Sequence, residues 1–290
     1  NTWLNDNVST WETFLKSSRI SYTIISDQTI ELGKHFDYDI LVLPGSKALS
    51  DKENSEIKKY LDRGGSVFAT GGTSSFDNSG KWRGWDFFTE VYGLKFSKEI
   101  KPEEYYQVHT LRGNLPITAG IPTGYTLKIA TWDRPIYAEI FEPRTIQASF
   151  WYDFRREAGL VREEVRKSAG IAYGTYGRGR YVWYGFEINS IVGKQEDYIY
   201  FDKLFRNCIN WLSYQPTAFV KDWPGQYDAA AIFIPTVTEN SDNISNIKNI
   251  SNIYKFRPTI FIDASSIDEN NGIVKRAASI GEVGAIVDVG

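Results

Sequence analysis

Apolar positions in the first 72 residues of the chain follow helical and strand-like spacings in turn. Trp11, Phe14 and Leu15 fall on one face of a helix, behind a capping-box spacing that starts at Ser9. Later segments alternate between short apolar runs and amphipathic stretches, which predict strands at 20–26, 39–43 and 66–70 and a helix at 54–63. Helices that alternate with buried strands over short connections predict a parallel sheet flanked by helices.

The pattern changes between residues 104 and 187, where shorter β-rich pieces are separated by polar breaks. We expect these strands to be antiparallel and partly exposed, and the turn at 177–179 predicts a hairpin. A helix is predicted over 201–212, because apolar residues recur there at the spacing of one helical face. The pattern breaks after residue 214, which we interpret as the end of a first domain, 1–214.

Strands and helices alternate again from residue 222. Apolar runs at 227–234, 258–263 and 282–288 predict three strands, and helices are expected in the two intervals between them. This order predicts the beginning of a barrel or a doubly wound sheet in a second domain, 222–290. No closing helix follows the last run, so we expect this domain to be incomplete at Gly290.

Composition and charge restrict the classes of function. The 290 residues are 42% hydrophobic and carry a formal net charge of -3, which predicts a globular protein without the cationic field that nucleic acid requires. The single Cys208 excludes an internal disulfide and a cysteine metal cluster. No stretch approaches the ~18 apolar residues of a transmembrane helix. We therefore expect no nucleic-acid partner and no membrane-spanning segment.

The segments 38–45 and 64–72, with a predicted helix between them, resemble the class I glutamine amidotransferase-like fold. Versions of this fold occur as accessory domains in glycoside-processing proteins. In active relatives the turn after the first strand supplies oxyanion donors and the turn after the second carries a cysteine nucleophile. Here the second turn, 71–74, has no cysteine, and Cys208 lies on the apolar face of a predicted helix. The resemblance, over about residues 1–214, implies the fold without the hydrolase chemistry.

Sheets of this kind usually bind ligands at the carboxyl ends of their strands. Trp82 adds a candidate aromatic platform for a sugar ring, whereas Trp85 and Phe88 have the spacing of a buried helical face. Glu187 follows a predicted strand and is a catalytic candidate if it faces the glycine turns. The candidate ligand-binding residues are Gly45, Ser46, Gly72, Thr73 and Trp82.

Neither histidine of the chain has a neighbouring nucleophile in the sequence. His35 lies in a polar stretch, and we expect it to be solvated. His109 lies in a β-rich stretch, where we expect it to pack within the sheet. Both residues therefore have structural interpretations that are simpler than a role as metal ligand or catalytic base.

The segments 229–234, 258–262 and 281–285 are similar to the first three strands of polysaccharide deacetylases. Those enzymes hydrolyse acetyl groups with a divalent metal held by an Asp and two His, beside an Asp that acts as base. Of the expected acidic and histidine motifs, only Glu239 and Asp288 stand at or near the matching positions. No metal site is therefore predicted, and Zn, Ni or Co is expected only if ligands outside these residues complete one.

Together these features predict an α/β protein with a flavodoxin-like parallel sheet, a β-rich insertion, and the start of a deacetylase-like (β/α) barrel. The predicted function is that of an extracytoplasmic, carbohydrate-associated module, noncatalytic or impaired, that binds or organises a polysaccharide or other glycan. One alternative is an active metal-dependent polysaccharide deacetylase with ligands outside this sequence, and another is a structural module for homo-oligomerisation. The catalytic candidates are Glu239, Asp288 and Glu187.

Overall fold

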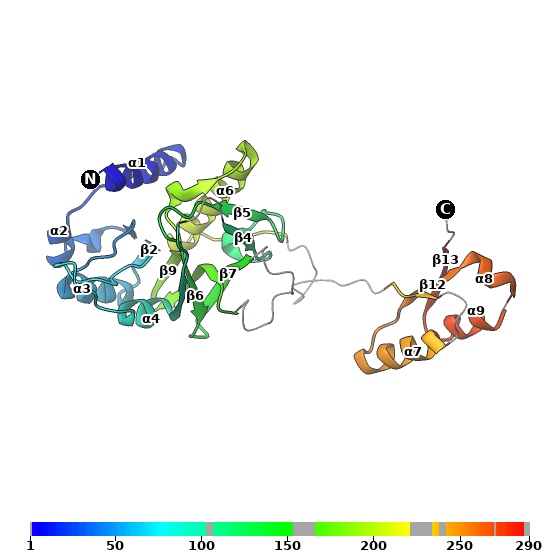
Figure 1. Cartoon of the computed structure of the whole chain (residues 1–290). Helices are drawn as coiled ribbons and strands as arrows, with labels where there is room; N and C mark the ends of the chain where they lie inside the picture. The colour runs from blue at the N-terminus through cyan, green and yellow to red at the C-terminus, as the bar shows by residue number, and fades with distance from the viewer. Residues whose placement is uncertain are drawn as a thin grey trace. The chain divides into compact units, whose positions relative to one another are not determined.

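The computed structural model describes residues 2–102, 107–152, 166–220, 234–237, 242–269 and 271–286. The protein is a mixed α/β protein. Its chain divides into two compact units, Asn1–Pro224 (unit 1) and Gly225–Gly290 (unit 2). Figure 1 shows the helices and strands of each unit, which are described separately below.

Three parallel strands form one part of the large sheet in unit 1. They are β1 (Ile40–Leu43), β2 (Ser66–Thr70) and β9 (Gly179–Tyr184), which lie in the order β1-β2-β9. Every residue of β2 is buried, because both faces of the strand are covered. The two strands predicted at 39–43 and 66–70 are confirmed, and their continuous apolar runs reflect this burial on two faces.

Alternate residues of β2 belong to different hydrophobic cores. Phe68 packs in one core with residues of α1 and α6, while Val67 and Ala69 pack in the other with residues of α3 and α4. Side chains alternate between the two faces of a strand, so these helices cover opposite faces of the sheet. The helices are α1 (Thr2–Ser17) and α6 (Gln195–Leu212) on the first face, and α2 (Asp27–Glu31), α3 (Asp51–Asp62) and α4 (Asp86–Tyr92) on the second.

The rest of the large sheet is antiparallel. Beyond β9 the order continues as β8-β7-β4-β5-β10, and β6 joins β8 and β3. Tyr176 pairs with Gly179, which confirms the predicted hairpin. The strands are β3 (Leu94–Glu99), β4 (Gln107–Leu111), β5 (Thr126–Ile129), β6 (Ile136–Ile140), β7 (Thr145–Tyr152), β8 (Ala169–Tyr176) and β10 (Ile191–Val192), and the short 3-10 helices are η1 (Lys34–Asp37), η2 (Pro116–Thr118) and η3 (Ile188–Ser190).

The strand predicted at 20–26 is wrong. Residues 20–26 pair with no strand in the described structure, and α2 begins at Asp27. Ile20 and Tyr22 pack against one hydrophobic core while Ile25 packs against the other, so the segment passes from one face of the sheet to the other. The residues that favour strands in this segment are there because they pack against the two cores, and not because the backbone pairs with a neighbouring strand.

Unit 2 contains a small parallel sheet in the order β11-β12-β13. Its core includes Val237, Ile260 and Ile262 from the strands and Ile244 and Ile247 from a helix. The predicted strand at 227–234 falls outside the described residues, except for Ile234, which is not in a strand. The elements are β11 (Thr236–Val237), α7 (Asp242–Tyr254), β12 (Thr259–Asp263), α8 (Ala264–Glu269), α9 (Asn271–Ala278) and β13 (Glu282–Ile286).

Among the helices that the structure describes, none has the length and apolar character that a bilayer crossing requires.

Candidate functional site

Glu187 lies where the carboxyl ends of β1, β2 and β9 meet. It follows β9, and its Oε2 accepts a hydrogen bond of 2.6 Å from Oγ1 of Thr70, the last residue of β2. The same Thr70 hydroxyl accepts a 2.7 Å hydrogen bond from the backbone N–H of Gly45, in the turn after β1. One hydroxyl and one carboxylate therefore connect the ends of three neighbouring strands.

The glycine turns allow this close approach to Glu187. Gly45 and Gly71 both have positive φ, of 56° and 57°. A Cβ added at these positions would lie 3.3 Å and 3.0 Å from Oε1 of Glu187. Glycine takes this left-handed conformation without a side-chain penalty, and it leaves room for the carboxylate. The carboxylate thus faces the turns after β1 and β2.

The first helix closes this strand-end region. Nδ2 of Asn7 donates a 2.9 Å hydrogen bond to Oε2 of Glu187, and the ring of Trp3 lies against Gly45. Nε1 of Trp3 donates to Oδ1 of Asp133 at 2.7 Å, and Oδ2 of Asp133 accepts from Ser190 at 2.9 Å. As a result, Glu187 is only 3% exposed and Asn7 is fully buried.

Burial raises the pKa of the Glu187 carboxyl group above its usual value. The hydrogen bonds from Thr70 and Asn7 and the charge of Lys47 lower this pKa, and the charge of Asp133 raises it, but burial is the largest effect. A carboxyl group that is buried and held by two donors lacks the access to substrate that a general acid or base requires. In this closed arrangement Glu187 acts as a cross-link between strand ends.

The other strand-end candidates are also engaged in local structure. The Thr73 side chain is buried and donates to the carbonyl oxygen of Thr70 at 3.0 Å. The Gly72 carbonyl accepts hydrogen bonds from the backbone and hydroxyl of Ser75, and the Ser46 carbonyl accepts one from the backbone of Ser74. The contact between Ser46 and Ser74 joins the two turns, and the others fix the turn after β2 internally.

A cluster of partly exposed aromatic rings lies beyond the turn after β2. Trp82 is 53% exposed and makes edge contacts with Phe76 and Trp85, at ring-centroid distances of 5.2 Å and 5.4 Å. Trp85 in turn stacks on Phe96 at 4.5 Å. We call Phe76, Trp82, Trp85 and Phe96 the aromatic surface. The next aromatic residues along the chain, Phe87 and Phe88, are buried with Tyr92 on α4.

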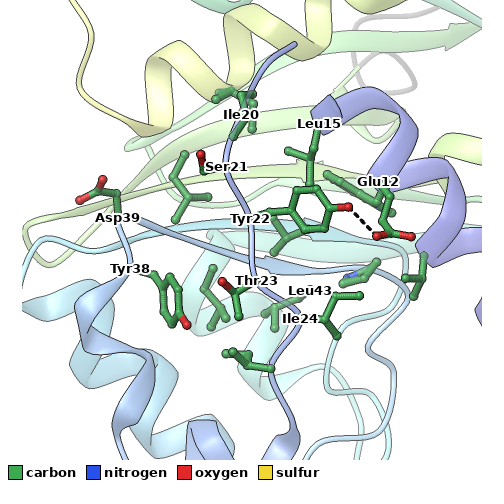
Figure 2. Close-up of a pocket in the computed structure, with 18 of the residues that line it drawn as sticks. Glu12, Leu15, Ile20, Ser21, Tyr22, Thr23, Ile24, Tyr38, Asp39 and Leu43 are labelled. Carbon is green, nitrogen blue, oxygen red and sulfur yellow. Dashed lines mark hydrogen bonds between the residues drawn. The ribbon is translucent and has the colours of Figure 1, made fainter. Parts of the chain in front are cut away.

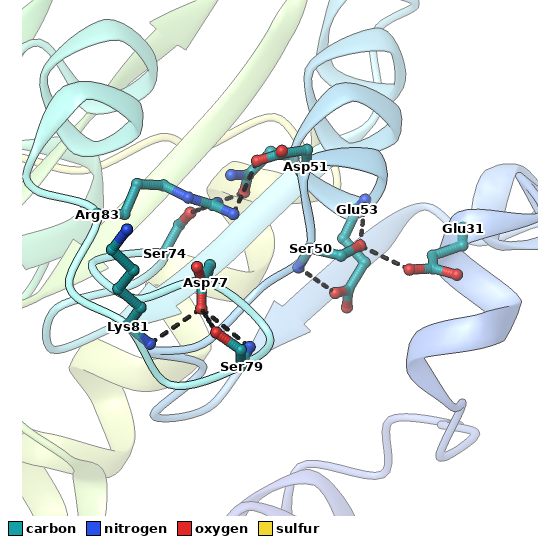
Figure 3. A network of polar contacts seen from close by, with 10 residues as sticks. Glu31, Ser50, Asp51, Glu53, Ser74, Asp77, Ser79, Lys81 and Arg83 are labelled. Carbon is teal, nitrogen blue, oxygen red and sulfur yellow. Dashed lines mark hydrogen bonds and ion pairs between the residues drawn. The ribbon is translucent and has the colours of Figure 1, made fainter.

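Polar side chains that neighbour Trp82 in the sequence make two separate groups of contacts, one around Arg83 and one around Asp77, shown in Figure 3. Arg83 forms an ion pair of 2.8 Å with Asp51 and donates to the hydroxyl of Ser74 at 3.1 Å, and that hydroxyl donates to Asn54 at 2.8 Å. Asp77 accepts from the backbone and side chain of Ser79 and from the backbone of Lys81. Arg83, the residue after Trp82, therefore contacts both Asp51 and Ser74.

Arg83 also lines a shallow polar cleft of about 430 Å³ between α3 and α4. Asp51 and Asn54 stand at the start of α3 because Ser50 and Glu53 form a capping box, which begins the helix three residues before the predicted position. Within the cleft, Lys58 pairs with Glu90. The cleft lining is Asp51, Asn54, Ser55, Lys58, Lys59, Asp62, Arg83, Asp86, Phe87, Glu90 and Tyr176.

Cys208 forms no reactive centre, and the two acidic candidates of the second domain are not described. Cys208 is buried, its Sγ lies 3.2 Å from the Tyr184 hydroxyl, and burial raises the pKa of its thiol to about 12. Glu239 and Asp288 lie outside the described residues. Within the described ranges no group of three or more His, Cys, Asp or Glu could hold a metal ion.

The two histidines both occupy buried positions. His109 packs in the sheet as expected, with Nε2 3.1 Å from the Tyr137 hydroxyl. The prediction that His35 is solvated is wrong, because its ring is buried between Phe36 and Tyr60. The polar residues around His35 in the sequence gave no sign of this packing.

Sequence reasoning also missed several members of the strand-end region. Trp3, Asn7 and Asp133 belong to no motif. Trp3 reaches Gly45 and Asn7 reaches Glu187 through tertiary packing, and Asp133 accepts a hydrogen bond from Trp3. Thr70 could have been predicted as a member of this region, because a polar residue at the end of a buried parallel strand lies at the carboxyl edge of the sheet.

Comparison with known proteins gives similarities of structure only. No family model matches the chain, and no curated protein matches it. A ThuA-like protein from Bacteroides uniformis superposes with a TM-score of 0.50 at 11% identity, covering 71% of this chain and 84% of that one. A β-galactosidase from Bacillus circulans sp. alkalophilus gives 0.46 at 11% identity, covering 62% of this chain and 23% of that one. The GH42 β-galactosidase Gan42B gives 0.46 at 16% identity, with 70% and 25% covered.

These similarities correct the predicted family. The chain spans about a quarter of the β-galactosidase chains that it matches. The match at a TM-score of 0.50 is to a ThuA-like protein, and no polysaccharide deacetylase is matched, so the predicted deacetylase family is wrong. The error has a physical origin, because a βαβαβ order recurs in many α/β folds and does not specify one family. The amidotransferase-like part of the resemblance agrees in fold with the ThuA-like match.

Proposed function

We propose that unit 1 is a noncatalytic glycan-binding module whose contact with sugar is the aromatic surface. The observation that carries this proposal is the 53% exposure of Trp82 next to Arg83, which contacts Asp51 and Ser74. The proposal extends to a function outside the cytoplasm, in association with polysaccharide.

Sugar rings match this surface in chemistry. A pyranose presents C–H groups on its faces and hydroxyl groups at its edge, so an exposed indole can pack against the face while polar side chains bind the edge. Arg83 follows Trp82 directly and contacts Asp51 and Ser74. A guanidinium group with spare N–H donors is suited to hydroxyl oxygens beside the stacked ring.

The same proposal describes the module as noncatalytic because the reactive side chains are inaccessible. Glu187 is 3% exposed, and the thiol of Cys208 is buried with a raised pKa. Neither group has the solvent access and activation that a nucleophile or general base needs. Exposed groups near Trp82, by contrast, are suited to hydrogen bonding and not to bond cleavage.

Calorimetric titration tests this proposal with hexasaccharides of β-1,4-linked glucose, galactose and N-acetylglucosamine. We expect the protein to bind at least one of them, and Trp82→Ala to weaken that binding tenfold or more, about 1.4 kcal/mol. The matched control is Trp132→Ala, since Trp132 is 58% exposed and lies outside the aromatic surface. No binding to any of the three, or an equal loss in both variants, would contradict the proposal.

A further inference from the structure

The outer edge of β1 is unpaired in the described structure. β1 lies at one end of the sheet order, and β2 is its partner. In a parallel ladder, alternate backbone groups of a strand point to opposite sides, so part of the Ile40–Leu43 backbone faces away from β2. A short edge strand with the apolar sequence Ile-Leu-Val-Leu is normally covered or paired.

A groove of about 910 Å³ lies along this edge. Residues 39–43 line one part of it, α1 contributes Leu4, Val8 and Trp11, and the segment 20–25 borders it from a third direction. Figure 2 shows Ile20 to Ile24 as one continuous stretch, with the hydroxyl of Tyr22 directed to Glu12 of α1. We call this space the β1-edge groove.

Several large apolar side chains in the β1-edge groove are exposed. Ile24 is 67% exposed, Leu4 is 45% exposed and Tyr38 is 38% exposed. Full burial of a large apolar side chain is favourable by roughly 1.5–3 kcal/mol, and covering the exposed part of these side chains would contribute a fraction of that each. The groove therefore has the character of a site for an apolar chain segment that would also satisfy the open edge of β1.

The path of α1 indicates where that segment comes from. Trp3 and Asn7, near the beginning of α1, lie at Gly45 and Glu187, beside the carboxyl ends of the parallel strands. The other end of α1 contacts α6, where Arg206 donates to the Ser17 carbonyl. The end of α6 lies at the start of β2, where Ser66 donates to the Leu212 carbonyl. α1 therefore runs from the carboxyl ends of the strands toward their amino ends.

We propose that the β1-edge groove holds an additional β-strand, formed by the polypeptide directly ahead of α1 and paired in parallel with β1. Such a strand would end at the carboxyl edge of the sheet, where α1 begins. α1 would then be the helix of a β-α-β crossover, the usual connection between parallel strands. A strand matching the four residues of β1 spans roughly 13 Å. It is apolar on both faces, because Trp11 of α1 lines the groove from one face of the sheet and Ile30 of α2 from the other.

This proposal is independent of glycan binding, since the aromatic surface contributes no residue to the groove lining. It is tested by hydrogen exchange on two forms of the protein. One is the 290-residue chain, and the other is the natural polypeptide with the residues that precede Asn1. We expect amide exchange in 40–43 to slow by roughly tenfold or more in the longer form. Unchanged exchange, a natural protein that starts at Asn1, or protection that needs a separate polypeptide would each overturn the proposal.

A substitution at Ile24 gives a second readout of the same strand. Ile24→Asp should be tolerated in the 290-residue chain, because the side chain is 67% exposed there. In the longer form it would place a carboxylate against the added strand, and we expect the melting temperature to fall by about 5 °C. The matched control is Ile199→Asp on α6, at 61% exposure and outside the groove. Equal effects of Ile24→Asp in the two forms would overturn the proposal.

Discussion

Two consecutive glycines after β2 face two regions of opposite character. A Cβ at Gly71 would lie 3.0 Å from the buried carboxylate of Glu187, whereas a Cβ at Gly72 would lie 3.3 Å from the ring of Trp85 in the aromatic surface. The strand-end region is closed by α1, and Glu187 in it is 3% exposed. The aromatic surface is open, with Trp82 at 53% exposure.

The difference separates residues that hold the fold together from residues available to a ligand. The polar groups of the strand-end region bind one another across strand ends, so their removal leaves buried donors without acceptors. The ring of Trp82 has few neighbours to lose, because half of it faces solvent. Substitutions in the closed region should therefore change stability, and those in the open region should change binding.

The largest expected effect is acid destabilisation through His109, which lies behind the strand-end region and packs against Phe186. Burial lowers the pKa of His109 from its ordinary value of 6.5 to about 3. The folded state then resists protonation while the unfolded state accepts it, so stability is full above pH 6.5 and falls as the pH drops toward 3. We expect a loss of about 3 kcal/mol between pH 7 and pH 4 from this group. Urea unfolding at a series of pH values measures it.

His109→Asn removes the titrating imidazole and isolates this contribution. The quantity compared between the variant and the wild-type protein is the slope of unfolding free energy against pH, and not the free energy at one pH. Glu187 and Glu53 act in the opposite direction, since burial raises the pKa of both groups. Stability from a raised carboxyl pKa is present at low pH and is lost as the pH rises through the folded-state value. An acid slope that is the same in His109→Asn and in the wild-type protein would show that other groups control acid unfolding.

The second effect is the loss of the cross-link at Glu187. Glu187→Ala leaves the Thr70 hydroxyl and the Asn7 amide without their buried acceptor, and we expect a loss of about 2–3 kcal/mol after the relief of burying a carboxylate. Chemical denaturation at neutral pH measures the change. Glu187→Gln is the matched control, because it retains one acceptor oxygen, and its loss should be smaller. An unchanged free energy of unfolding in Glu187→Ala would mean that the packing of α1 does not depend on this carboxylate, and the contrast between the regions would fail.

A third and smaller effect concerns Gly45. Gly45→Ala adds a Cβ at a positive φ and against the ring of Trp3, so we expect a loss of about 1–2 kcal/mol and displacement of Trp3. Gly80→Ala is the control, because Gly80 also has a positive φ but an added Cβ meets open space. Thermal unfolding gives the stability change of both variants. Equal losses would show that backbone strain alone, and not closure by Trp3, explains the Gly45 effect.

The sequence predicted the elements of the sheet better than the membership of either region. The apolar runs at 39–43 and 66–70 are confirmed because burial on both faces leaves a continuous signal in the sequence. β3 was missed because only its first residue, Leu94, is buried and the rest of the strand is exposed. The segment 20–26 has the composition of a strand, but it packs against both cores without pairing. The composition of a segment indicates that it is buried, but it does not indicate which strand, if any, its backbone pairs with.

The candidate residues follow the same rule. Glu187 was predicted because it follows a strand, and it does face the turn after β1, whereas Asn7 and Trp3 come from a helix whose packing the local sequence does not encode. The buried position of His35 was missed for the same reason, since the aromatic ring of Tyr60 that covers it is distant in sequence. Contacts between remote segments depend on the whole fold, and this is why local periodicity did not identify them.

The smallest expected change in stability is the sharpest test of the open region. Trp82→Ala removes edge contacts with Phe76 and Trp85 from a ring that is already half in solvent, and we expect a loss below about 1 kcal/mol. Urea unfolding at neutral pH measures this loss, and calorimetry on the same sample measures sugar binding. A small loss of stability with a large loss of binding means that the ring serves a ligand. A loss of stability as large as that of Glu187→Ala would mean that Trp82 braces the turn after β2, and the aromatic surface would then belong to the structural framework.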